Sequence, residues 1–99
     1  MLLQLAQFLQ LNPRRALRVE GYTDSTGNAS DNRALSQARA QAVVDLLASL
    51  GVAPERMAVR GYGGQFPIEA NASERGRALN RRVEVVVSDR QGRLGAERE

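Results

Sequence analysis

The sequence predicts an α/β (or α+β) domain, a two-layer sandwich in which helices cover one face of a small mixed β-sheet. Two short segments alternate apolar and polar residues with the period of a β-strand, and a third is rich in β-branched residues. Amphipathic segments separate them, and glycine or proline ends most of these segments. The chain has 99 residues, 42% of them hydrophobic and 25% charged, which is enough for one two-layer core.

The expected elements alternate along the chain. In order, they are a helix over residues 2–11, a strand over 16–22, a helix over 31–50, a strand over 57–63, a short helix over 74–79 and a strand over 81–89. Ser30 or Asp31 is the expected N-cap of the long helix, and Gly51 suits the position after its end. The strands "VEGY" and "VRGY" both close in Gly-Tyr, which suggests a shared structural device. Residues 1–88 form the domain and residues 89–99 a polar, flexible tail.

Composition excludes several classes of chemistry. The chain has no cysteine and no histidine, so it can form no disulfide, no thiol nucleophile, no Cys/His zinc site and no histidine base. No metal and no cofactor is expected, and no carboxylate pair stands out, so we expect no enzyme. No apolar run approaches the ~20 residues that span a membrane. The apolar start has no basic region or cleavage site, which favours a helix over a signal peptide.

The loop "GYTDSTGNASDN" and the helix after it carry the candidate binding residues. Asp24 brings a carboxylate into a loop rich in turn formers. Arg39 falls inside the apolar stripe predicted for one face of this helix. The stripe consists of Leu35, Ala38, Ala42, Val43, Leu46 and Leu50. A guanidinium on a core-facing side must be paired or must emerge at a cleft. If the loop folds back over the helix, Asp24 and Arg39 approach each other.

Two interpretations of this pair stay open at the level of the residues. One is an internal Asp24–Arg39 salt bridge that closes the loop. The other is a clamp for a zwitterion, because an arginine grips a carboxylate in two hydrogen bonds and an aspartate accepts from an ammonium. Asn32 at the helix entrance suits capping or bracing better than ligand contact, and Thr26 suits a turn.

A group of arginines near the end of the chain raises the question of nucleic-acid binding. Arg75, Arg77, Arg81 and Arg82 are close in sequence, and the net charge is +3. However, Glu74 and Glu84 lie among them, and aromatic residues for base stacking are scarce. Salt bridges and loop bracing are the simpler interpretation.

Four motifs in order resemble the OmpA-like C-terminal domain, also called the OmpA/MotB peptidoglycan-associating domain. They are "VEGYTDSTG", "NRALSQARAQAVVDLL", "VRGYGGQFPI" and "GRALNRRVEVVV", and together they cover about residues 17–87. The resemblance implies non-covalent anchoring to the cell wall through the peptide stem of peptidoglycan, chiefly its meso-diaminopimelate residue. It also implies a periplasmic location, with attachment to the outer membrane or envelope through a region outside this chain.

The resemblance assigns roles to particular positions. The family's ligand-binding aspartate and arginine correspond to Asp24 and Arg39, and its other ligand positions to Thr26, Asn32 and Arg81. Tyr22 stands where the family has a histidine, so its hydroxyl and ring can replace only part of that contact.

A second departure concerns the sheet. Family domains open with a further strand, and this chain starts in the helix that should follow it. An exposed sheet edge can pair with another copy, so a homodimer is expected. The alternatives to peptidoglycan binding are a basic nucleic-acid-binding module and a structural oligomerisation domain with an internal Asp24–Arg39 salt bridge.

Overall fold

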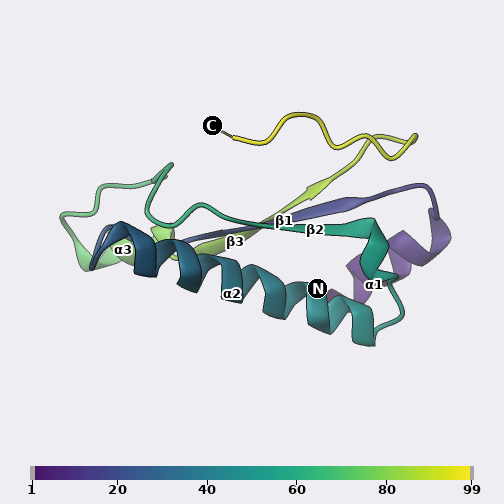
Figure 1. The fold of residues 1–99 in the computed structure, drawn as a ribbon, viewed down its shortest axis with the longest axis horizontal. Coiled ribbons are helices and arrows are strands. Elements are labelled where there is room, and N and C mark those ends of the chain that lie inside the picture. The colour runs from purple at the N-terminus through teal and green to yellow at the C-terminus, as the bar shows by residue number, and fades with distance from the viewer. Residues whose placement is uncertain (1, 99) are drawn as a thin grey trace.

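A computed structural model describes residues 2–98 and confirms the predicted order of helices and strands (Figure 1). The elements are α1 (Leu2–Leu11), β1 (Leu17–Tyr22), α2 (Ala29–Ser49), the short 3₁₀ helix η1 (Pro54–Arg56), β2 (Met57–Gly61), α3 (Glu74–Asn80) and β3 (Arg82–Val87). Within the described range the sheet has three strands in the order β2-β1-β3. β1 runs parallel to β2 and antiparallel to β3, and α2 lies along one face of the sheet. The sheet is therefore mixed, as predicted.

The face of β1 that meets the helices is apolar. Leu17 and Val19 are completely buried, and Leu17 packs in one cluster with Leu9 and Leu47. Val19 packs in a second cluster with Ala40 and Val44 of α2. The two clusters share partly buried neighbours, so they form one continuous core between the sheet and the helices.

The Gly-Tyr pairs at the ends of β1 and β2 play the same structural role: each glycine makes room for α2, and each tyrosine packs against the other. Gly21 and Gly61 are partners across β1 and β2, and both lie directly beneath α2. A Cβ atom at Gly21 would stand 2.0 Å from the carbonyl oxygen of Ser36, and one at Gly61 would stand 2.5 Å from the Gln37 nitrogen. The glycines therefore let the helix backbone approach the strand ends. The tyrosines that follow them stack, with ring centroids 5.5 Å apart.

α2 begins earlier than the sequence suggested. Its N-cap is Asn28, whose side-chain oxygen accepts a hydrogen bond of 2.8 Å from the Asp31 N–H. The predicted caps, Ser30 and Asp31, are wrong because both lie inside the first turn, where Asp31 faces the positive end of the helix dipole. The end of the helix is as predicted, since Gly51 takes a positive φ of 100° just after it.

The predicted apolar stripe of α2 is wrong at most of its positions, although Val43 and Leu50 are half-buried and pack against the core. The buried residues of α2 are Ser36, Ala40, Val44 and Leu47. Leu35 and Leu46 are instead 44% and 47% exposed. Small residues face the sheet because the helix backbone comes so close to Gly21 and Gly61. Arg39 is therefore exposed on the flank of the helix and is not a charge in the core.

The other face of the sheet is polar and is covered by the end of the chain. Residues 89–98 form no helix or strand, and the tail returns over the sheet on the side opposite α2 (Figure 1). β1 is buried along its whole length as a result, including the charged residues Arg18 and Glu20. Among residues 2–98, β2 and β3 are the two edges of the sheet, and edge pairing with a second copy stays a prediction.

Candidate functional site

The loop between β1 and α2 is held firmly at several points. The Thr23 N–H donates to the Gly63 carbonyl at 2.8 Å, which joins the loop to the turn after β2. The Asn32 side-chain amide donates to the carbonyls of Asp24 at 3.4 Å and Thr26 at 2.9 Å. Asn32 therefore braces the loop, whereas the capping role that the sequence favoured for it is wrong, because the N-cap of α2 is Asn28. These contacts fix the position of Asp24, since the backbone is tied on both sides of it.

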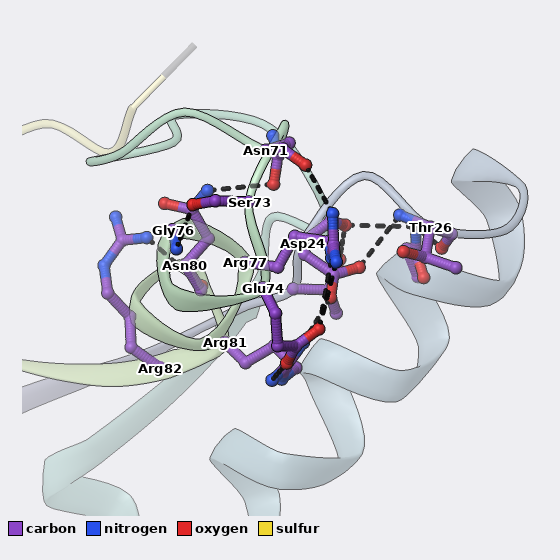
Figure 2. A network of polar contacts seen from close by, with 12 residues as sticks. Asp24, Thr26, Asn71, Ser73, Glu74, Gly76, Arg77, Asn80, Arg81 and Arg82 are labelled. Carbon is purple, nitrogen blue, oxygen red and sulfur yellow. Dashed lines mark hydrogen bonds and ion pairs between the residues drawn. The ribbon is translucent and has the colours of Figure 1, made fainter.

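The Asp24 carboxylate accepts two strong hydrogen bonds. One oxygen accepts from the Thr26 N–H at 2.8 Å, and the other accepts from the Arg81 guanidinium at 2.6 Å (Figure 2). Only 11% of its side chain is exposed. The Thr26 N–H, and after it Arg81, hold the pKa of Asp24 below its ordinary value. Asp24 is therefore a fixed, charged acceptor.

Arg81 joins Asp24 to the short helix α3. It donates to Asp24 and, through its other terminal nitrogen, to Glu74, both at 2.6 Å. The hydrogen bond from Arg81 is the main reason why the pKa of Glu74 is lowered. The register explains the contact with Asp24: Tyr22 pairs with Arg82 across β1 and β3, so the residues just beyond these two lie side by side.

The predicted contact between Asp24 and Arg39 is not formed. Among residues 2–98, Asp24 has its ion pair with Arg81, and Arg39 makes no ion pair or side-chain hydrogen bond. Arg39 follows Asn32 by seven residues, or about two helical turns, so both lie on the same flank of α2. α2 thus presents a free guanidinium about two turns after Asn32, the residue that holds the Asp24 loop.

The turn that carries Arg81 is organised by a buried amide that the sequence did not reveal. Asn80 is completely buried, and its side chain accepts from the N–H groups of Ile68 and Glu69 and donates to Glu69 and Asn71. It ties the segment after β2 to the end of α3, as Figure 2 shows in part. Asn80 is the last residue of a helix of only about two turns, which is too short for a periodic pattern to mark it as buried.

The arginines near the end of the chain mostly brace the structure. Arg77 pairs with Glu74 and donates to the Asn71 carbonyl. Arg82 pairs with Glu84 and donates to the Phe66 carbonyl at 3.0 Å. With Arg81 engaged as described above, the simpler interpretation of this group, salt bridges and loop bracing, is confirmed for these three residues.

Tyr22 differs from the other predicted ligand residues because it is fully enclosed. Its hydroxyl donates to Glu20 at 2.9 Å, and the Arg82 guanidinium lies 3.8 Å from its ring centroid. Burial, and then the bond to Glu20, raise the pKa of Tyr22. A direct ligand contact of Tyr22 stays a prediction; in the free chain it supports the end of β1.

A hollow of about 250 Å³ adjoins the loop. Its lining includes Ser25, Asn32, Arg33 and Tyr62, but not Asp24, Arg39 or Arg81. The three charged residues therefore lie outside this hollow, with Asp24 almost fully buried and Arg39 exposed. Within residues 2–98, no group of three acidic side chains could hold a metal ion.

Known proteins with a similar sequence come from bacterial envelopes. Residues 1–81 match the OmpA family. Outer membrane porin F of Pseudomonas fluorescens is 47% identical over 83 residues, which is 84% of this chain and 26% of the porin. The peptidoglycan-binding protein ArfA of Mycobacterium tuberculosis is 44% identical over 85 residues, 86% of this chain and 26% of ArfA. The chain thus spans about a quarter of the length of these relatives.

Solved structures show the same fold. The peptidoglycan-associated lipoprotein of Burkholderia pseudomallei superimposes with a TM-score of 0.85 at 37% identity, over 88% of this chain and 74% of that one. The C-terminal domain of MotB from Helicobacter pylori gives a TM-score of 0.79 at 33% identity, over 88% of this chain and 68% of that one. The small α/β architecture is therefore the one that these domains share.

Proposed function

Because the chain belongs to the OmpA family, we propose that it binds peptidoglycan without covalent chemistry and anchors an envelope protein to the cell wall. Two relatives support this proposal by name, the peptidoglycan-binding protein ArfA and the peptidoglycan-associated lipoprotein. The observation that carries it is the placement of two opposite charges around one loop. Asp24 is a fixed carboxylate in the loop, and Arg39 is a free guanidinium on the flank of the helix that Asn32 joins to that loop.

The ligand is the free amino-acid end of meso-diaminopimelate in the stem peptide. This end carries an ammonium and a carboxylate side by side. The carboxylate suits the two parallel donors of Arg39, and the ammonium suits the remaining acceptor capacity of Asp24. Thr26 and Asn32 hold the loop in place, and Arg81 stands beside Asp24. No bond is made or broken, so the domain acts as a binder and not as an enzyme.

Glu74 has a supporting part in this binding. In the free chain, Arg81 divides its donors between Asp24 and Glu74. When the ligand ammonium approaches Asp24, Arg81 keeps the second carboxylate as its partner. Asp24 can then turn an oxygen toward the ligand without leaving a guanidinium unpaired, which limits the cost of the exchange.

The pH dependence of binding follows from Asp24. Its pKa is lowered in the folded chain, so the carboxylate is charged wherever the pH exceeds its ordinary pKa of about 3.9. No histidine is present, and no other side chain ordinarily titrates between about pH 5 and 8. Co-sedimentation with purified sacculi is therefore expected to stay constant over that range. Binding and the Asp24–Arg81 pair are lost together only as the pH falls below about 4, while loss near pH 6.5 would contradict this assignment.

The proposed function is tested by the chemistry of the wall. The chain is incubated with insoluble sacculi of the diaminopimelate type and, separately, of the lysine type, and the pelleted fraction is measured. Lysine lacks the extra carboxylate, so we expect the chain to bind lysine-type wall at least about tenfold more weakly than diaminopimelate-type wall. Equal binding to both walls would reject the diaminopimelate clamp. Repeating the assay at two salt concentrations, with duplex DNA as competitor, tests the nucleic-acid alternative, whose affinity would fall steeply with salt.

The same proposal gives the domain a place in the envelope. We propose that it lies in the periplasm and that a region outside this chain attaches it to the outer membrane or another envelope structure. Outer membrane porin F, of which the chain spans 26%, supports this by name. Residues 2–98 contain no helix with the length and apolar character needed to cross a bilayer.

A further inference from the structure

The sheet face opposite α2 is built as a polar surface. Along β1 it presents Arg18 and Glu20, which pair at 2.9 Å although both are almost fully buried. Along β3 it presents Arg82 and Glu84, which also pair. Each arginine of these two strands thus has a carboxylate within its own strand. Arg60 on β2, which is the register partner of Glu20, has no carboxylate within its own strand.

The end of the chain is seated on this face through its main chain. The buried guanidinium of Arg18 donates to the carbonyls of Gly95 and Ala96, both at 3.3 Å. The N–H of Arg98 donates to the hydroxyl of Tyr62 at 3.0 Å. Tyr62 stacks on Tyr22 and meets the ring of Phe66 edge-on, so the acceptor for the Arg98 N–H is a side chain that the fold itself holds in place.

One side chain of the tail completes the contact. Glu97 pairs with Arg60 at 2.9 Å, and so supplies the carboxylate that the sheet lacks at that position. The Arg98 guanidinium lies 4.8 Å from the ring centroid of Phe66. Main-chain hydrogen bonds at fixed points, with one charge-complementary side chain, are how proteins recognise peptide segments.

We propose that this face is a docking track for a peptide segment of a partner protein that bends at a glycine and carries one carboxylate two residues later, and that residues 95–98 occupy it in the free chain. The track consists of Arg18, Arg60, Tyr62 and Phe66. Its occupant needs a residue that tolerates a positive φ where Gly95 lies and a glutamate or aspartate where Glu97 lies. The track uses none of Asp24, Arg39 and Arg81, so it stands independently of the peptidoglycan site.

The test releases the tail without changing the track. Gly95 has a positive φ of 75°, and no atom lies within 4 Å of the position a Cβ would take. Gly95→Val therefore strains only the seated conformation of the tail, by an amount that should make the track roughly five- to thirty-fold more available. The probe is a labelled, acetylated and amidated hexapeptide, Arg-Leu-Gly-Ala-Glu-Arg, titrated into the full chain by fluorescence anisotropy.

Substitutions that neutralise single charges, in the chain or in the probe, test whether binding is specific. We expect the Gly95→Val chain to bind the probe five- to thirty-fold more tightly than the unaltered chain, and Glu97→Gln to act in the same direction. A probe with glutamine in place of glutamate should bind about two- to fivefold more weakly. Arg60→Gln in the Gly95→Val chain should remove that difference, whereas Glu55→Gln, an exposed change in η1, should leave all values unaltered.

Three outcomes would overturn the proposal. The first is that the Gly95→Val chain, with an unchanged circular dichroism spectrum, binds no probe or binds it no better than the unaltered chain. The second is equal binding of the glutamate and glutamine probes. The third is a dimer of the Gly95→Val chain in sedimentation, which would assign the track to a second copy of this chain.

Discussion

Replacing Asp24 or Arg39 with alanine is expected to abolish co-sedimentation with diaminopimelate-type sacculi while the fold stays intact. Each change removes one half of the proposed clamp and leaves one charge of the ligand without its partner. Truncating one member of such a charge pair costs about 2–5 kcal/mol, or roughly thirty-fold to several thousandfold in affinity. The measurement is the bound fraction in a pelleting assay over a range of sacculus concentrations.

Matched surface changes separate this effect from a general loss of charge. Arg14→Ala removes an exposed arginine that follows α1, and Glu55→Ala removes an exposed acid from η1, and neither residue contributes to the contacts of the Asp24 loop. Both controls should pellet like the unaltered chain. Asp24→Ala leaves Arg81 its pair with Glu74, so little stability should be lost. If the Asp24 and Arg39 variants pellet like the controls, the site is wrongly assigned.

Gly21→Ala is expected to have the largest effect on stability. The new methyl group would lie 2.0 Å from the Ser36 carbonyl oxygen and 2.8 Å from its carbon, and both atoms belong to the backbone of α2. Neither the strand nor the helix can move without disturbing the core between them. We expect a loss of about 3 kcal/mol or more in the free energy of unfolding, which corresponds to a fall in Tm of about 12–24 °C for a domain of this size.

The same substitution at another glycine is the control for this effect. Gly95→Ala places its methyl group in open space on the tail, outside the core, and carries only the strain of a positive φ of 75°, about 1–2 kcal/mol, which release of the tail can relieve. Thermal unfolding followed by circular dichroism should therefore show a much smaller fall in Tm for Gly95→Ala than for Gly21→Ala. A Gly21→Ala chain with the same Tm as this control would mean that α2 does not lie as close to β1 as the structure has it.

The order of the elements could be predicted because each one carries its own local signal. β1 and β2 alternate apolar and polar residues and end at Gly-Tyr, β3 is rich in β-branched residues, and Gly51 follows α2 in the conformation that glycine favours. These signals depend on residues close together in the sequence. The Gly-Tyr pairs were noticed but not explained, because the close approach of α2 that requires the glycines is a tertiary contact.

The parts that could not be predicted depend on contacts between distant residues. The face of α2 differs from the prediction because a helix this close to a sheet buries Ser36 and Ala40 and leaves Leu35 and Leu46 exposed on its flanks. The partner of Asp24 was misjudged because Arg81, 57 residues away, is brought to it by the register of β1 and β3. Arg39 was selected for an incorrect reason, and its proposed role now depends on its free guanidinium and on the family.

The most direct test of the binding proposal is a titration of the free chain with meso-diaminopimelate, followed by the backbone amide signals in NMR spectra. The Thr26 N–H donates a hydrogen bond to the Asp24 carboxylate, so its chemical shift reports any change in the contacts of that carboxylate. We predict saturable shifts at Thr26, Asn32, Arg39 and Arg81, and no such shifts with lysine at the same concentrations. Shifts confined to other parts of the chain, or equal shifts with both amino acids, would contradict the proposed clamp.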